Sequence, residues 1–109
     1  MSAPDPESPR PVVALIEWHA PSLRVEEAAT LAKETVRAFG RIPGLRSIRF
    51  FGDFTTGTHW YLQTWDSEAA HDAYMASEAM FSIRGLAAQW VDGRPTRRIL
   101  TDYTPDPRS

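Results

Sequence analysis

The chain of 109 residues contains neither cysteine nor asparagine. Without cysteine there can be no disulfide, no thiolate nucleophile and no zinc–thiolate site, so any chemistry must use other side chains. No apolar run approaches the roughly 20 residues that a membrane-spanning helix needs, and the N-terminus lacks the apolar segment of a signal peptide. We therefore expect a soluble, cytoplasmic protein without a membrane partner.

The sequence carries little net charge and no recognisable nucleotide-binding motif. The net charge of -2 gives no electrostatic reason to bind nucleic acid, so we expect a small neutral or apolar ligand instead. The sequence has no glycine-rich phosphate loop, no nucleophile elbow and no paired acidic motif for Mg²⁺. His19, His59 and His71 do not have the spacing of a metal-ligand set. We therefore expect no cofactor and no metal.

Proline marks both ends of the chain. The segment Met1–Pro11 has prolines at positions 4, 6, 9 and 11 and no apolar periodicity, so it cannot form regular hydrogen-bonded structure or bury much surface. We expect it to be a flexible leader and Pro105–Ser109 to be a flexible tail. Residues 12–104 contain no repeat and no internal linker, which predicts a single domain.

Alternating apolar patterns predict four strands, at Val12–His19, Leu45–Phe54, Thr58–Trp65 and Thr96–Tyr103. The second and third strands are joined by a short hairpin at residues 55–57. Gly52 within the second strand is a candidate β-bulge.

Helical apolar spacing predicts two helices on the same sheet. The first spans Val25–Phe39 after a cap at Ser22, and the residues expected to face the sheet are Val25, Ala28, Ala29, Ala32, Val36 and Phe39. The second starts at Asp66 or Ser67, breaks near Ala76–Ser77 and continues over Glu78–Val91. Gly85 in the continuation indicates close packing or a kink.

The resulting order β-α-β-β-α-β is the split βαβ arrangement of a ferredoxin-like α+β domain. Such a domain has a four-stranded antiparallel sheet with helices on one face, and its other face is bare. An exposed apolar face of that size recruits a partner, and the simplest partner is a second copy of the chain. We therefore predict a homodimer through the open sheet face, with a cavity enclosed in each subunit.

Three segments carry a resemblance to a known family: the first strand VVALIEWH, the turn IPGL, and the block YLQTWDSEAAHDAYMASEAMF with Tyr74 and Ser77. They resemble the dimeric α+β barrel superfamily and, within it, the antibiotic-biosynthesis-monooxygenase-like proteins. The resemblance implies a cofactor-free oxygenase whose pocket asparagine, tryptophan and tyrosine side chains hold a phenol-like substrate and stabilise its anion.

Two departures from that family pattern affect the expected chemistry. Since the chain has no asparagine, the missing amide partner has to be replaced by Glu17, His19 or Gln63. The haem-degrading branch of the superfamily carries its iron-binding histidine in the region that matches Phe81–Leu86. That region contains Arg84 and no histidine, which argues against haem degradation.

The candidate site combines a base with aromatic walls. Histidine titrates near neutrality and a carboxylate can hold its tautomer, while tryptophan and tyrosine offer hydrogen-bond donors beside flat apolar surfaces. We predict a catalytic group made of His19, Glu17, Trp65 and Tyr74. The predicted substrate-binding residues are Trp18, Phe50, His59, Trp60, Tyr61, Gln63 and Phe81. The pattern alone leaves open which face of each strand lines the cavity.

These observations together predict a small cofactor-independent monooxygenase-like enzyme that acts on an aromatic or polyketide-like molecule in secondary metabolism. A polyketide cyclase or isomerase of the same fold is an alternative, and so is a non-catalytic dimeric protein that binds a small molecule. Arg94, Arg97 and Arg98 form a short basic group, which we interpret as a solvated edge or a dimer contact rather than an anion site.

Overall fold

The computed structural model describes residues 10–105 of the chain. Most of the predicted leader and tail, residues 1–9 and 106–109, lies outside the described residues.

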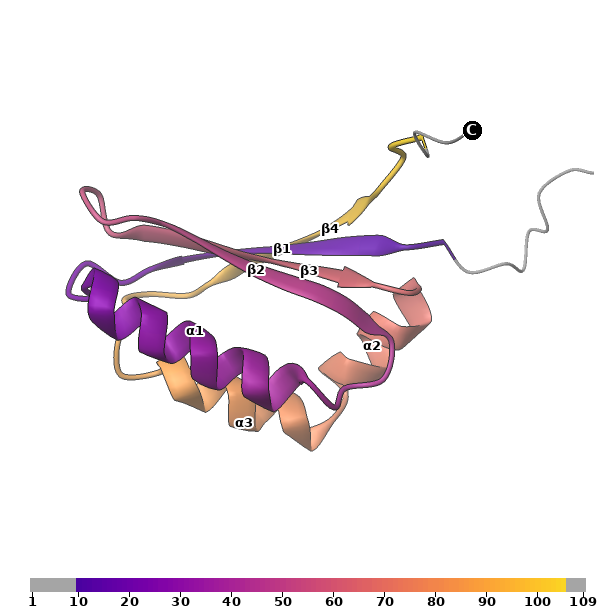
Figure 1. The fold of residues 1–109 in the computed structure, drawn as a ribbon, viewed down its shortest axis with the longest axis horizontal. Coiled ribbons are helices and arrows are strands. Elements are labelled where there is room, and N and C mark those ends of the chain that lie inside the picture. The colour runs from indigo at the N-terminus through magenta and orange to yellow at the C-terminus, as the bar shows by residue number, and fades with distance from the viewer. Residues whose placement is uncertain (1–9, 106–109) are drawn as a thin grey trace, which may run out of the picture.

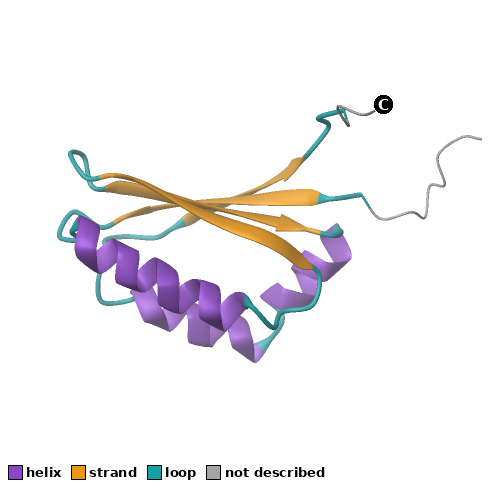
Figure 2. Cartoon of the chain, in the orientation of Figure 1, coloured by secondary structure: helices purple, strands orange, loops and turns teal. Residues whose placement is uncertain are grey.

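Seven elements make up the domain. In chain order they are β1 (Val12–His19), α1 (Val25–Phe39), β2 (Leu45–Asp53), β3 (Thr58–Trp65), α2 (Glu68–Met75), α3 (Glu78–Ala87) and β4 (Thr96–Thr101). The strands form one sheet in the order β2-β3-β1-β4, and every neighbouring pair is antiparallel. All three helices lie on the same face of the sheet (Figures 1 and 2). This arrangement confirms the predicted ferredoxin-like α+β fold.

The pairing of β1 with β3 determines which side chains face the helices. Val12, Ala14, Ile16 and Trp18 of β1 are all buried on that face. They pair with Trp65, Gln63, Tyr61 and His59 of β3, respectively. Because directly opposed residues in a sheet share a face, these four β3 side chains also face the helices. Glu17, His19 and Trp60 consequently lie on the open face.

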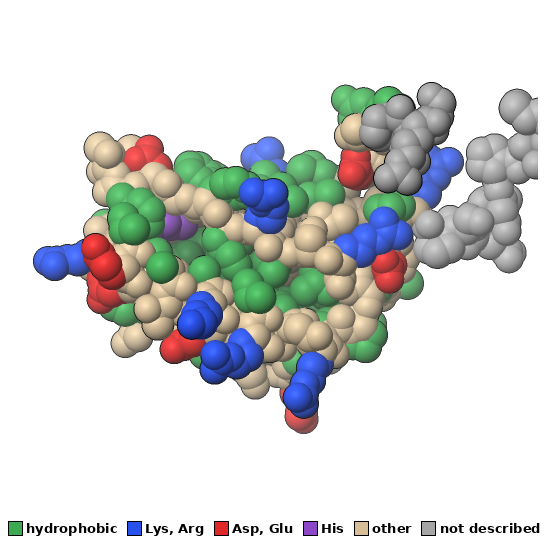
Figure 3. Space-filling view, in the orientation of Figure 1, with side chains coloured by type: hydrophobic (Ala, Val, Ile, Leu, Met, Phe, Trp, Pro, Cys, Tyr) green, Lys and Arg blue, Asp and Glu red, His purple; other side chains and the backbone are tan. Residues whose placement is uncertain are grey.

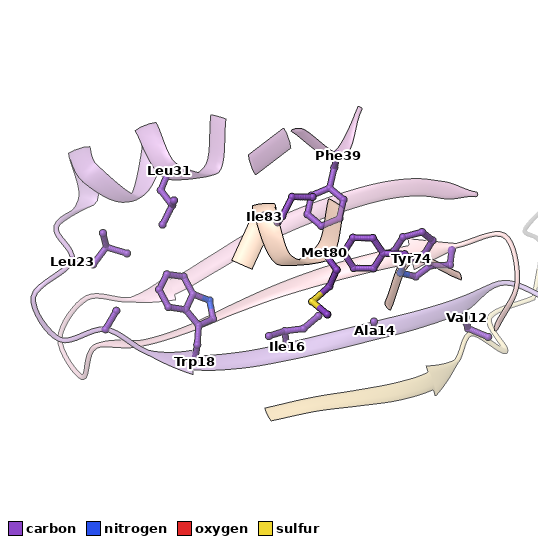
Figure 4. Packing of buried hydrophobic residues seen from close by; sticks show 12 residues of the cluster. Val12, Ala14, Ile16, Trp18, Leu23, Leu31, Phe39, Tyr74, Met80 and Ile83 are labelled. Carbon is purple, nitrogen blue, oxygen red and sulfur yellow. The ribbon is translucent and has the colours of Figure 1, made fainter. Parts of the chain in front are cut away.

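The core occupies the layer between this face and the helices. Figure 4 shows Trp18 and Ile16 of β1 on one side of this layer and Leu31, Met80 and Ile83 of the helices on the other. Hydrophobic side chains are visible along the band between the sheet and α1, with Lys and Arg on the outer side of the helices (Figure 3). The molecule is therefore a two-layer domain with one core.

Helix α1 is rotated from its predicted orientation. Val25 and Val36, which we expected to face the sheet, are 56% and 47% exposed, whereas Leu31, Thr35 and Phe39 are buried. Thr35 can be buried because its hydroxyl donates to the carbonyl oxygen of Leu31 at 2.8 Å. The predicted cap at Ser22 is also wrong. The N-cap residue is Arg24, whose backbone N–H donates to Glu27 Oε1 at 3.2 Å.

The predicted break in the second helical segment is confirmed. Ser67 caps α2 by accepting from the backbone N–H of Ala70, and the chain leaves the helix between Met75 and Glu78. Helix α3 ends at Ala87 rather than at Val91, because Ala88 and Trp90 donate to carbonyls three residues back. Strands β2 and β4 end one and two residues earlier than predicted, at Asp53 and Thr101.

Gly52 does not mark a β-bulge, and Gly85 is not closely packed. Gly52 pairs in register with His59, and the irregularity in β2 lies instead between Leu45 and Ser47. A Cβ at Gly52 would lie 2.5 Å from His59 Nδ1, so the glycine leaves room for the imidazole. A Cβ at Gly85 would meet nothing within 4 Å, which excludes close packing as the reason for that glycine.

Candidate functional site

A cavity of about 560 Å³ lies between the helix-covered face of the sheet and the helices. Its aromatic wall consists of Trp18, Phe50, Tyr61 and Tyr74. The apolar remainder comes mainly from α3 and the chain after it: Met80, Ile83, Ala87, Ala88, Val91 and Pro95. Three arginines also line it: Arg84, Arg94 and Arg97. The volume falls within the range of about 300–1,000 Å³ that is typical of small-molecule sites.

The structure brings seven of the eleven predicted site residues to this side of the sheet. Trp18, Phe50, Tyr61 and Tyr74 line the cavity directly. His59, Gln63 and Trp65 are buried at 3%, 0% and 0% exposure and pack beside the cavity without lining it.

The remaining four predicted residues lie elsewhere. Glu17 and His19 project from the opposite face of β1, and Trp60 lies beside them on β3. Glu17 Oε1 accepts a hydrogen bond of 2.8 Å from Trp60 Nε1, and within residues 10–105 it makes none with His19. Phe81 is 66% exposed on α3. The predicted base and its orienting carboxylate are therefore not part of this cavity.

An aromatic cluster supports one end of the cavity. The ring centroids of Trp65 and Tyr74 are 5.2 Å apart, and those of Phe39 and Tyr74 are 5.3 Å apart. The His71 ring meets Trp65 edge-on at 5.8 Å. Tyr74 is thus held between a strand residue and a helix residue, with little freedom to move.

Burial keeps the two cavity phenols neutral. Loss of solvation raises the pKa of Tyr61 above its ordinary value, and it raises the pKa of Tyr74 from 10.0 to about 12. The positive charge of Arg97 acts in the opposite direction on both groups. Near neutral pH both cavity-lining side chains therefore carry the phenol proton.

Arg97, which we expected to lie in an exposed or interfacial basic group, joins a polar network that is partly buried. Arg97 Nη1 donates to Gln63 Oε1 at 3.2 Å and lies 3.2 Å from His71 Nε2. Gln63 Oε1 also accepts from Trp65 Nε1 at 3.1 Å. His71 Nδ1 lies 3.2 Å from Asp72 Oδ1. Since arginine can only donate, His71 accepts at Nε2 and carries its proton at Nδ1, toward Asp72.

Burial also lowers the pKa of Arg97 from its ordinary value, because the cation loses solvation. An arginine side chain nevertheless stays protonated in proteins. The cavity thus holds a fixed positive charge at the sheet side, opposite Ile16 in the β1–β4 pairing.

Three buried nitrogen atoms in the described part of the chain have no hydrogen-bond partner: Trp18 Nε1, His59 Nε2 and Gln63 Nε2. His59 packs against Trp18 and Phe54 with ring centroids 5.0 Å away in each case, and burial lowers its pKa. Trp18 is 9% exposed and lines the cavity. Its indole nitrogen lies on the side of the ring turned toward Met80 and Ile83 (Figure 4). The indole N–H therefore has no acceptor among the described residues.

Neither a metal site nor a membrane span is found in the described part of the chain. No three or more His, Cys, Asp or Glu side chains among residues 10–105 are grouped so as to hold a metal ion. None of the helices described there has the length and apolar character that crossing a bilayer requires.

No protein-family model and no curated protein matches the sequence. Solved structures do match. SnoaB, a cofactor-independent oxygenase from Streptomyces nogalater, superposes with a TM-score of 0.70 at 14% identity, over 90% of this chain and 98% of that one. The crystal structure of an antibiotic biosynthesis monooxygenase gives 0.66 at 18% identity, over 86% and 99%. The chain has the same fold as these two proteins.

A shared fold does not by itself establish a shared reaction. A conserved protein from Methanosarcina mazei, described without an activity, matches with a TM-score of 0.69 at 16% identity, over 86% of this chain and 94% of that one. At identities this low, the comparison establishes the shared fold and not the activity.

The sequence patterns missed the three cavity arginines. For Arg97 a signal existed: in the predicted antiparallel sheet, alternate residues of the last strand share the face of Ile16 and Ala14, and Arg97 and Ile99 are those residues. For Arg84 and Arg94 no such signal existed, because their approach to the cavity depends on how α3 and the following loop cross the sheet.

Proposed function

We propose that the chain is a cofactor-independent oxygenase that acts on a planar aromatic, polyketide-like molecule bound in the cavity. The observation that carries the proposal is an aromatic-walled cavity with neutral phenols and an unpaired indole N–H. Such walls fit a flat ring system, and the donors fit an oxygen atom on it. The fold shared with SnoaB supports the same reaction class.

The proposed reaction begins with ionisation of a phenol or enol in the substrate. The N–H of Trp18 and the O–H groups of Tyr61 and Tyr74 donate to the resulting oxyanion and so stabilise it. No carboxylate or imidazole is among the cavity-lining residues of the described chain. The proton therefore passes to solvent, and the site acts by stabilising the anion.

Electrons then pass from the anion, which has carbanion character at the ring methylene, directly to O₂. One oxygen atom forms the new carbonyl group. The other leaves as water with the two hydrogens of the methylene, so the substrate supplies every electron that O₂ accepts.

Oxygen consumption with dithranol, a dihydroxyanthrone, tests the proposal. We expect uptake above the spontaneous rate, with one quinone formed per O₂. Trp18→Phe keeps an aromatic ring, though a smaller one, and removes the N–H donor, so kcat/KM should fall on the order of 100-fold. Trp60→Phe makes the same change on the open face and should leave turnover unaltered. An unchanged rate in Trp18→Phe would remove this residue from the mechanism.

A non-catalytic binding protein is the second candidate, favoured by the absence of a carboxylate or imidazole base from the lining of the described cavity. In that case dithranol should quench the tryptophan fluorescence of the protein with a saturable curve, while oxygen uptake stays at the spontaneous rate.

We also propose that a second copy of the chain covers the open sheet face. That face carries apolar side chains on all four strands, among them Leu15, Leu62 and the partly exposed Phe51 and Leu100, at 49% and 43%. An apolar surface spread over a whole sheet is typical of an interaction site, and a symmetric pair would cover both copies with the same residues.

A further inference from the structure

The charges around the cavity are unbalanced. Arg84, Arg94 and Arg97 line it, and no Asp or Glu does. Within residues 10–105, Arg46 forms an ion pair with Asp66 and His71 a hydrogen bond with Asp72, and none of the three cavity arginines has a carboxylate partner there. Arg84 and Arg94 are exposed, whereas Arg97 is partly buried. A cation that loses part of its hydration is normally paired, since that loss is costly. The unpaired charge of Arg97 indicates that its partner is the ligand.

Arg97 is also held in a defined position. Its Nη1 contacts Gln63 Oε1 and His71 Nε2, each at 3.2 Å. Asp72 fixes the tautomer of His71 that can accept this hydrogen bond. Within the described residues, Nε and Nη2 of Arg97 make no hydrogen bond. One corner of the guanidinium is therefore anchored, and the other donors remain free for a ligand.

The free donors of Arg97 lie near a second unpaired donor and the aromatic wall. Tyr61 and Tyr74 are close enough for their charge states to interact with that of Arg97. Arg97 pairs with Ile16 of β1, and Trp18, whose Nε1 is unpaired, lies two residues further along the same strand. A planar molecule with an acidic group at one end and an oxygen at the other matches this layout.

We propose that the natural ligand is an aromatic carboxylic acid whose carboxylate binds Arg97. This inference rests on the proposed function, because it assumes that the cavity is the ligand site, and it adds the charge of the ligand. A planar carboxylate fits the fork of a guanidinium better than a phenolate oxygen does, because it can accept two parallel hydrogen bonds. It replaces our sequence-based expectation of a neutral or apolar ligand.

Two probes of nearly the same shape, anthraquinone carboxylate and anthraquinone carboxamide, test the inference by fluorescence titration of the intact protein. We expect the carboxylate to bind about tenfold more tightly, as one charge-assisted pair predicts. Arg97→Met should abolish this preference and leave the affinity for the carboxamide within about twofold. Arg97→Lys keeps the charge without the fork and should retain part of the preference. Arg98→Met, which changes the exposed neighbour on the open face, should behave as wild type.

The outcomes separate this inference from the proposed function. If the carboxamide binds as tightly as the carboxylate, or if Arg97→Met keeps the preference, the carboxylate inference is overturned while the oxygenase proposal stands. A hydroxyanthraquinone that binds more tightly than the carboxylate overturns it in favour of a phenolate. If neither probe binds, both proposals fail. Far-ultraviolet circular dichroism of Arg97→Lys and Arg97→Met, compared with wild type, identifies any loss of fold.

Discussion

The two faces of β3 carry similar residue types in very different states. On the helix side, His59 and Gln63 are buried, and each has a ring or amide nitrogen without a partner in the described chain. On the open side, Trp60 is partly exposed and its indole N–H is satisfied by Glu17. Unpaired buried donors are costly unless something binds them. The comparison therefore places unsatisfied polar groups on the helix side and a satisfied one on the open side.

The largest expected effect comes from the two tryptophans of β3. Trp65→Ala removes a fully buried ring that packs on Tyr74 and His71, and it should lower the free energy of unfolding by about 3–5 kcal/mol. Trp60→Ala, on the open face, should cost less than half as much. Urea unfolding at a fixed protein concentration measures both. Equal losses would contradict the assignment of the two faces.

A charge on the open face tests whether a second copy covers it. Leu62→Lys would place an ammonium group in the interface of each copy, and the cost of desolvating it should raise the dimer dissociation constant roughly 100-fold or more. Glu34→Lys changes an exposed residue of α1 and should leave association unchanged. Sedimentation velocity over a concentration series measures both variants. A wild-type chain that stays monomeric at high concentration would refute the dimer.

At high pH, the stability of the folded chain should depend on Tyr74, which lies in the layer between the sheet and the helices. The folded chain holds the phenol proton up to about pH 12, whereas in the unfolded chain it leaves near the ordinary pKa of 10.0. Between pH 10 and pH 12 the unfolded state binds fewer protons than the folded state. The free energy of unfolding is therefore highest below pH 10 and falls by about 2–3 kcal/mol as the pH rises toward 12. Urea midpoints across this range should show the loss, and Tyr74→Phe should reduce it. A midpoint that declines equally in Tyr74→Phe would locate the cause elsewhere.

The smallest expected effects come from two glycines. A Cβ at Gly52 would lie 2.5 Å from His59 Nδ1, so Gly52→Ala should displace that ring from Trp18 and cost about 1–3 kcal/mol. Gly85→Ala, where a Cβ would meet nothing within 4 Å on a helix, should stabilise the chain by about 0.5–1 kcal/mol. Thermal unfolding of the two variants beside wild type gives the signs. Stabilisation by Gly52→Ala would show that His59 has room to spare.

The elements of the fold could be predicted because their signals are local. The bounds of β1 and β3 follow from short β-rich runs that end at turn residues, and the break between α2 and α3 follows from Ser77. The orientation of α1 could not be predicted in this way. Its sequence offers two apolar stripes, and burial of Thr35 depends on a hydrogen bond to Leu31 that periodicity does not register.

The site was predicted only in part for the same reason. Alternation groups Glu17 with His19 and Tyr61 with Trp65, but it does not say which group faces the helices, since neither face of β1 or β3 is plainly polar. That choice depends on where the helices pack. The network of Arg97, Gln63 and His71 joins residues 26 and 34 positions apart, and no local pattern reports such a contact.

The strict alternation of β3 also has a consequence for how the protein can change. Residues 59, 61, 63 and 65 face the helices and residues 58, 60, 62 and 64 face outward, so neighbouring codons affect different surfaces. Substitutions in the first set change the cavity wall at Tyr61 and the packing beside it without altering the outer surface, and substitutions in the second set do the reverse. The eight residues of β3 thus form two sets, one on each face of the sheet, that can be substituted separately.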